Sequence, residues 1–232
     1  MRWRGRKSRA LKTTPSERGA PARFYHATPL HYAPAILASG FLCSQRTLGA
    51  RVPTIRPRVT AFRRDRKLHL DGYVHFAFTA VTPLLLDKAR RGYPHIVFEF
   101  AAGISDLDGA AFLKFNPKSW RHRDDFLPVT CRQEKDSFLR AWSEGSYPSA
   151  ELLVPGPVPL AGYCVQIIAP TEEALAGLLR CADAVNAVLP APLQVGEAFP
   201  LGPLIDLAPY TAYLEACIAA RAVLPPPDLP FD

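Results

Sequence analysis

The chain has 232 residues, of which 48% are hydrophobic and 21% are charged, a composition that predicts one sizeable core and an ordinary soluble surface. No apolar run approaches the roughly 20 residues that a membrane-spanning helix needs, so we expect no membrane partner. The five cysteines are scattered and form no CxxC pair. This pattern argues against a disulfide framework and a bound metal, and it favours a cytoplasmic location.

The net charge of +7 is unevenly distributed along the chain. Residues 170–232 carry two basic residues against eight acidic ones, which leaves residues 1–169 with a net charge of +13. An excess of this size predicts a polyanionic partner, because lysine and arginine bind the phosphates of any nucleic acid whatever its sequence. The alternative is that the charge serves solubility alone.

The first third of the chain predicts an arm, a strand, a short helix and a basic loop. Residues 1–22 are polar and basic, which is typical of a flexible arm. Residues 23–30 (RFYHATPL) predict an aromatic-rich strand, and residues 31–42 predict a short helix with Gly40 at its C-terminal cap. Residues 46–67 hold seven arginines and one lysine, and their two prolines predict a loop.

The middle of the chain continues with strands and helices. Residues 72–81 (GYVHFAFTAV) alternate as a strand would, with Val74, Phe76 and Phe78 on one face. Residues 82–92 predict a helix that Thr82 caps at its start, and residues 95–100 predict a further strand. The stretch from 102 to 149 is irregular, apart from a helix predicted over 134–145.

The last third predicts strands at 151–154, 162–169 and 192–199, and helices at 171–189 and 207–224. The order lacks the regular strand-helix-strand alternation of a parallel sheet, so we predict an α+β fold with a split, mostly antiparallel sheet. The predicted organisation is a basic flexible arm over 1–22, one domain over 23–200, and an appended helix with a proline-rich tail over 201–232.

Four features could carry chemistry. They are His26 with Thr28 in the first strand, the arginine-rich loop, the aromatic strand over 73–78, and Glu151 at the head of a late strand. Each has an ordinary structural interpretation: a hydrogen-bonded histidine, a solvated loop, a core strand and a strand-end acid, since strand interiors disfavour acids. Their order along the chain indicates function more strongly than any one of them alone.

In that order, the features resemble the ADP-ribosyltransferase fold, and within it the DarT family of bacterial toxins, which attach ADP-ribose to bases of DNA. The resemblance rests on FYHAT and AILASGFL within residues 24–42, RRDRK at 63–67, GYVHFAFTAVTPLLL at 72–86 and SAELLVPGPVP at 149–159. It extends from about residue 24 to residue 200. The arm and roughly the last 30 residues lie outside it.

The chain departs from the family at two places. The family usually has an asparagine six residues past the histidine, where this chain has Tyr32. Its aromatic strand usually reads Pro-Phe-Tyr-Phe, where this chain reads His75-Phe76-Ala77-Phe78. Both positions bear on the choice of target base and on how NAD is held.

The resemblance implies a role for individual residues. Glu151 would be the catalytic carboxylate, and Arg64 would stabilise charge during transfer, with Arg63 as the fallback. His26 and Thr28 would contact the adenosine or ribose of NAD. The other implied NAD contacts are Gly40, Arg63, Tyr73, and the rings of Phe76 and Phe78, which could stack on nicotinamide. The implied nucleic-acid contacts are Arg58, Arg66, Lys67, Trp120, Arg121 and Arg123.

The resemblance thus implies an NAD-dependent mono-ADP-ribosyltransferase that modifies a base of nucleic acid, with single-stranded DNA favoured and no metal required. In the family such enzymes are toxins restrained by an antitoxin that often carries a macrodomain, so a toxin or phage-defence role is expected. Two alternatives stay open. The acceptor could be RNA or protein, or the chain could be a nucleic-acid-binding module of the same fold that no longer turns over NAD.

Overall fold

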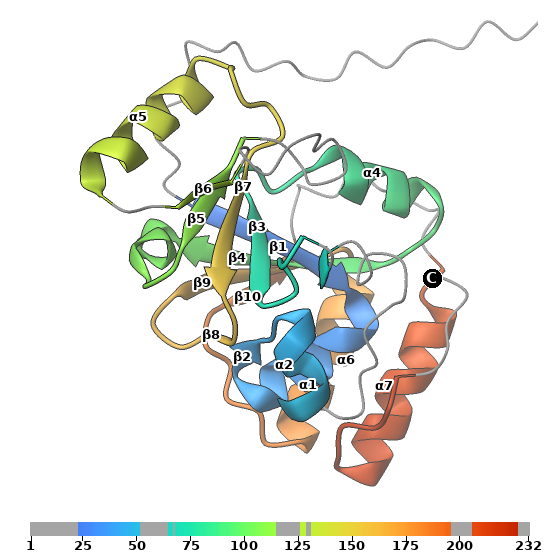
Figure 1. The fold of residues 1–232 in the computed structure, drawn as a ribbon. Coiled ribbons are helices and arrows are strands. Elements are labelled where there is room, and N and C mark those ends of the chain that lie inside the picture. Colours follow the sequence, from blue (N-terminus) through green and yellow to red (C-terminus); the bar gives the residue numbers. More distant parts are fainter. Residues whose placement is uncertain are drawn as a thin grey trace, which may run out of the picture.

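The computed structural model describes residues 23–51, 65–66, 68–114, 126–128, 131–195 and 206–226. Within them, eight strands form one sheet in the order β10-β9-β4-β1-β3-β7-β5-β6 (Figure 1). The strands are β1 (Arg23–Pro29), β3 (Tyr73–Ala77), β4 (His95–Ala101), β5 (Ala111–Leu113), β6 (Phe126–Pro128), β7 (Glu151–Pro155), β9 (Cys164–Ala169) and β10 (Leu193–Val195). All neighbours are antiparallel except β9 and β10, which confirms the predicted mostly antiparallel sheet.

The sheet is split between β1 and β3. Strand β1 pairs with β4 over its whole length, from Arg23 to Pro29. On its other side it pairs with β3 at one position, where Tyr25 faces Ala77. The backbone of β1 after Tyr25 therefore separates from the start of β3, as the predicted split sheet requires.

A second, two-stranded sheet joins β2 (Phe41–Leu42) to β8 (Val158–Pro159). The helical segments are η2 (Leu30–Tyr32), α1 (Ala33–Ser39), α2 (Gln45–Arg51), α4 (Pro83–Arg90), η3 (Ala102–Asp106), α5 (Arg132–Ser143), α6 (Glu172–Ala184) and α7 (Ala208–Ala220). Figure 1 shows α1, α6 and α7 grouped together, while α4 and α5 lie apart from that group.

The main core lies between one face of the sheet and the group of α1, α6 and α7. Phe76 of β3 and Phe98 of β4 are fully buried there, and β3 alternates as the sequence predicts. Strand β7 does not alternate, because Leu152, Leu153 and Val154 are all buried. A strand buried on both faces holds its first residue, Glu151, rigidly at the edge of the core.

The helix boundaries confirm several predicted caps. The side chains of Thr82 and Thr171 each accept a hydrogen bond from the backbone three residues on, as N-caps do. Gly40 ends α1 with a left-handed backbone (φ 72°), a conformation that glycine adopts without a side-chain clash. Helix α6 ends at Ala184, earlier than predicted, just before a left-handed turn at Asn186.

The region over 46–67 is not entirely a loop, because its first residues belong to α2. The prolines at 53 and 57, on which the loop prediction rested, lie outside the described residues. Residues 52–64 lie outside the described part of the chain. None of the described helices combines the length and the apolar character that a bilayer-spanning segment requires.

Helix α7 is part of the main core and not an appended helix, which corrects the predicted boundary after residue 200. Its residues Tyr210, Leu214 and Cys217 are buried in the same cluster as the sheet. It packs against α6 where Gly177 allows close approach, since a Cβ added there would lie 2.8 Å from Leu214 Cδ1. The helix therefore belongs to the domain.

Candidate active site at the split sheet

Glu151 forms a side-chain pair with a histidine of the neighbouring strand. In the β3–β7 ladder Ala77 faces Glu151, so His75, two residues earlier, presents its side chain on the same face. His75 Nδ1 lies 3.0 Å from Glu151 Oε2. An ionised carboxylate has no proton to give, so Nδ1 is the donor. Both side chains keep some contact with solvent, with exposed fractions of 28% for His75 and 17% for Glu151.

Competing effects set the pKa of His75. Burial is the largest and lowers this pKa, because it disfavours the charged ring. The hydrogen bond and charge of Glu151, the charge of Asp65 and the Leu70 carbonyl together outweigh burial and raise the pKa above its ordinary value. The Nε2 atom of His75 is buried, and no described group meets hydrogen-bond geometry with it.

His26 is in the opposite electrostatic situation. Its Nδ1 lies 2.9 Å from the His75 carbonyl oxygen, which can only accept, so Nδ1 carries a proton. Burial lowers the pKa of His26 to about 4, against a raising effect of that hydrogen bond, and the charge of His75 lowers it further. The ring is therefore neutral at pH 7. Its Nε2 then carries no proton and is available as an acceptor.

His75 thus connects the two residues that the sequence singled out. Its side chain contacts Glu151, and its backbone carbonyl accepts from His26. The His26 ring lies edge-on to Phe76, with centroids 5.9 Å apart, at the place where β1 and β3 separate. Residues 125 positions apart in sequence therefore meet at the split through one residue of β3. In the sequence His75 stands out as a departure from a family strand, and no sequence pattern indicates this link.

The other predicted NAD contacts have mixed surroundings. Thr28 is buried on the same strand as His26, and Tyr73 is half-buried at the start of β3. The predicted stacking of Phe76 or Phe78 on nicotinamide conflicts with the structure. Phe76 is 0% exposed and Phe78 is 6% exposed, so neither ring presents a face to a ligand. These rings fill the core, with Phe78 packed 5.1 Å from both Phe24 and Trp142 (ring centroids).

The residues predicted to contact nucleic acid, or to stabilise charge during transfer, lie largely outside the described residues. Of the basic residues in the loop, Arg66 is described and exposed, and its charge helps to lower the pKa of Asp71. The predicted residues that lie outside the described part are Arg58, Arg63, Arg64, Lys67, Trp120, Arg121 and Arg123. Their roles stay predictions. Among the described residues, no group of three or more metal-ligating side chains comes together.

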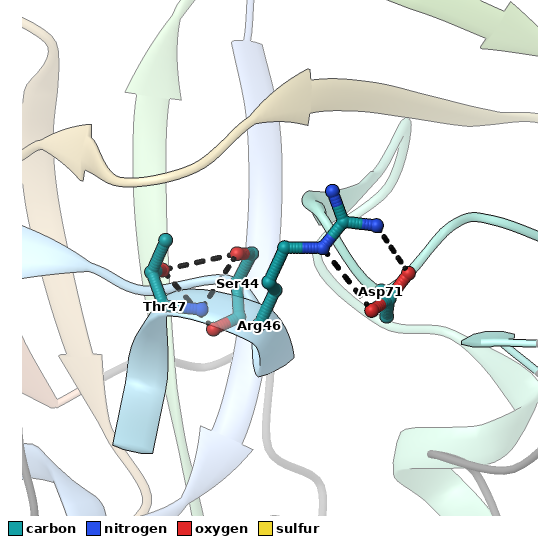
Figure 2. Close-up of polar contacts among 4 residues, drawn as sticks. All are labelled: Ser44, Arg46, Thr47 and Asp71. Carbon is teal, nitrogen blue, oxygen red and sulfur yellow. Dashed lines mark hydrogen bonds and ion pairs between the residues drawn. The ribbon is translucent and has the colours of Figure 1, made fainter. Parts of the chain in front are cut away.

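A polar clip, formed by Ser44, Arg46, Thr47 and Asp71, fixes the start of β3 to α2 (Figure 2). Arg46 donates from Nε and Nη2 to the two carboxylate oxygens of Asp71, at 3.2 and 2.9 Å, and its backbone N–H donates to the Asp71 carbonyl. The hydrogen bond from Arg46 is the main cause of the lowered pKa of Asp71. Ser44 and Thr47 join hydroxyl to hydroxyl across the first turn of α2.

The clip also reaches the end of β7. The backbone N–H of Gly156 donates to the Gly72 carbonyl at 2.9 Å. Gly156 lies so close to Ser44 that a Cβ there would be 2.7 Å from the Ser44 nitrogen. Both strands that carry the His75–Glu151 pair are therefore held against the start of α2, at the end of the ladder away from Glu151. In the sequence Arg46 is one of several arginines of a predicted loop, and no pattern there indicates Asp71 as its partner.

The strand order, the split and the helices form a DarT-like fold. Solved DarT structures share it. The chain superposes on DarT of Thermus sp. 2.9 in complex with ADP-ribosylated ssDNA with a TM-score of 0.59 and 17% identity, over 78% of this chain and 97% of that one. The same protein in complex with NAD+ gives a TM-score of 0.51 and 16% identity, over 76% of this chain and 96% of that one.

A further solved structure extends the likeness to another organism. DarTG of Thermosipho africanus in complex with ADP-ribose gives a TM-score of 0.55 and 18% identity, over 77% of this chain and 51% of that one. No protein-family model matches the chain, and no curated protein matches it. At these identities the likeness establishes the fold, which confirms the fold expected from the sequence.

Proposed function

We propose that the protein is an NAD-consuming mono-ADP-ribosyltransferase that modifies a base of nucleic acid, with single-stranded DNA the favoured acceptor. The observation that carries the proposal is the Glu151 carboxylate, hydrogen-bonded by His75 at the split of a DarT-like sheet. The DarT structures that share this fold contain NAD+ or ADP-ribosylated ssDNA.

The carboxylate suits the first half of such a reaction. Breaking the bond between ribose and nicotinamide leaves positive charge on the sugar, and a fixed carboxylate stabilises that charge in the transition state. Glu151 is held by its strand and by His75, so it need not reorganise when the charge forms. Its limited exposure, 17%, reduces the screening of its charge by water.

His26 suits the binding of the sugar. At neutral pH its unprotonated Nε2 accepts a hydrogen bond, and a ribose hydroxyl is a donor of the right kind. Thr28 on the same strand is the next polar side chain along that face. We assign both to the ribose or adenosine part of NAD. We assign Gly40 and Tyr73 to the surface that also contacts NAD. Gly40 has a structural role as well, as the cap of α1.

The transfer balances without a further reagent. The bond from the ribose anomeric carbon to nicotinamide breaks, and its electron pair leaves with nicotinamide. A ring nitrogen of the base forms the new bond to the same carbon and loses its proton to solvent. We assign stabilisation of charge in this step to Arg64 or to Arg63, since a guanidinium holds its proton too firmly to act as a base.

The charge of the chain favours nucleic acid as the acceptor. Residues 1–169 carry a net charge of +13, which favours a phosphate-rich partner. We further propose a toxin or defence role in the cytoplasm, restrained by an antitoxin with an ADP-ribose-removing macrodomain. RNA or protein as acceptor is the second enzymatic candidate. A binding module without turnover is the third candidate, and it predicts salt-sensitive nucleic-acid binding with no nicotinamide release.

The test is nicotinamide release and transfer of label from NAD to single-stranded DNA, RNA and protein. Glu151→Gln keeps the size of the side chain and removes its charge, so we expect release to fall by about 100-fold or more, within the range seen when a fixed transition-state stabiliser is removed. Glu144→Gln, at an exposed position after α5, is the matched control and should behave as wild type. Equal release by wild type and Glu151→Gln would refute the proposal.

A further inference from the structure

We propose that His75 is a positioning residue for Glu151: it fixes the carboxylate through Nδ1, and its protonation switches the net charge of the His75–Glu151 pair between zero and −1. This inference rests on the proposed function, because it assigns Glu151 to catalysis. It starts from the 3.0 Å contact of Nδ1 with Oε2.

The geometry makes His75 a precise support. Its backbone belongs to β3, whose five residues from Tyr73 to Ala77 pair with β7 without a break in register. The start of the strand is fastened by the clip, and its carbonyl at position 75 accepts from His26. The imidazole therefore has little freedom to follow a moving carboxylate, and it determines which rotamer of Glu151 is occupied.

A neutral imidazole and an imidazolium both donate from Nδ1, so the contact survives protonation. The net charge of the pair, by contrast, changes on protonation. With an imidazolium the pair is neutral overall, and its field at the sugar is weak. With a neutral ring the pair carries the charge of the carboxylate, and it stabilises the cationic ribose better. The rate of nicotinamide release should therefore rise as His75 loses its proton.

The surroundings of His75 raise the pH at which the pair changes its charge above the ordinary range for a histidine. Among the described residues, the charged or titratable groups that act on His75 are Glu151 from β7, Asp65 from the segment ahead of β3, and His26 from β1. The two acids favour the imidazolium. His26 is neutral near pH 7 and opposes protonation of His75 only when the pH approaches 4. Because the groups interact, the observed value belongs to the pair.

The kinetic test compares His75→Asn, His75→Ala and wild type. Asparagine keeps a donor near the position of Nδ1 and cannot ionise, whereas alanine removes the donor. For His75→Ala we expect kcat for nicotinamide release to fall about 10- to 100-fold, as small displacements of catalytic groups do, with KM for NAD changed by less than about threefold. His75→Asn should recover most of this loss at pH 8. It should also lack the rise in rate that wild type shows from pH 6 to pH 8.

Two results would overturn the inference. One is a kcat for His75→Ala equal to that of wild type, and the other is a His75→Asn variant that keeps the wild-type pH profile. His95→Asn is the control, because His95 is another half-buried histidine, bonded to the Tyr93 carbonyl on β4. It should leave both the rate and the pH profile unchanged.

A measurement without turnover separates this inference from the proposed function. The His75 ring is titrated by NMR in wild type and in Glu151→Gln. We expect the pKa of His75 to fall in the variant, because the main groups that raise it include the charge and hydrogen bond of Glu151. An unchanged titration would refute the pair. A wild type that releases no nicotinamide would refute the proposed function while this titration still reported on the pair.

Discussion

His26 and His75 share one site, yet their surroundings move their pKa values in opposite directions. Burial lowers the pKa of His26 to about 4, and its hydrogen bond to a carbonyl does not compensate. His75 is partly buried, but Glu151 supplies a charge and an acceptor that raise its pKa. His26 is thereby neutral near pH 7 and can accept from the sugar. His75 donates to the carboxylate in both protonation states, and its raised pKa moves the change in charge of the pair to higher pH.

The lowered pKa of His26 makes the fold sensitive to acid. The unfolded chain binds this proton at about pH 6.5 and the folded chain at about pH 4, so stability is fully present above pH 6.5 and is lost as the pH falls toward 4. We predict that wild type loses about 2 kcal/mol more than His26→Asn between pH 7 and pH 5. Urea unfolding at both pH values measures the difference.

The control for this prediction is built into the comparison. His75 has a raised pKa, so its contribution to stability is present below pH 6.5 and is lost as the pH rises through the folded value, the reverse of His26. His75 titrates in both wild type and His26→Asn, so its contribution to stability cancels in the comparison. Identical losses of stability for wild type and His26→Asn would show that His26 is not held neutral by the fold.

At the scale of residues, the place of Glu151 at the head of a strand was predictable, and its contact with His75 was not. An acid at the head of an apolar strand is visible in the sequence, and its order after His26 and Thr28 made a site plausible. The contact with His75 depends on the register of β3 against β7, which is set by long-range packing. The alternation of β3 also predicted that Phe76 and Phe78 share a face, but not that the core closes over that face.

At the scale of elements, two strands and one short helix position the pair. Strands β3 and β7 present the side chains, and α2 fastens the start of one strand and the end of the other. The places of β1, β3 and α4 were predictable from aromatic alternation and from caps such as Thr82, although β3 ends at Ala77, before the predicted end at residue 81. Helix α2 was missed because its seven residues sit in a segment whose basic, proline-containing composition resembles a loop.

The anchoring of β7 gives a prediction at Gly156. A methyl group there would lie 2.7 Å from the Ser44 nitrogen and 2.8 Å from its Cβ, and neither backbone can yield cheaply. We predict that Gly156→Ala lowers the free energy of unfolding by about 1–3 kcal/mol, the usual cost of overpacking. Nicotinamide release should fall as well, because the shift propagates along β7 to Glu151.

Gly103→Ala is the matched control for Gly156→Ala. A Cβ at Gly103 would meet nothing within 4 Å, so this variant should stay within about 0.5 kcal/mol of wild type. Chemical denaturation of both variants, with the release assay alongside, measures the two effects. A Gly156→Ala protein as stable and as active as Gly103→Ala would argue against the clip.

At the scale of the whole molecule, the fold is an eight-stranded sheet with a second, two-stranded one. Helices α1, α6 and α7 pack on the face opposite the Glu151 side chain, and α4 packs through Leu85 on the other face. The composition and the order of elements predicted this class, since strands and short helices mix without parallel alternation. What they could not predict was the docking of α7. Its sequence is apolar on nearly every side, so no single face marks the surface that it buries. The contact with α6 depends on the small size of Gly177.

Leu214 tests whether α7 is integral to the domain. Its side chain is 2% exposed between α6 and the rest of the core, so Leu214→Ala should lower the free energy of unfolding by about 2–5 kcal/mol, through lost burial and the cavity left behind. Leu179→Ala removes the same atoms from a position on α6 that is 40% exposed, and it should cost less than about 1 kcal/mol. Denaturant unfolding compares the two variants.

Because Cys181 and Cys217 are both 0% exposed, their reaction with a thiol reagent should also be faster in Leu214→Ala than in wild type. Equal stabilities for the two leucine variants would mean that α7 packs loosely outside the core, whereas a large gap would make it a structural part of the domain that carries the site.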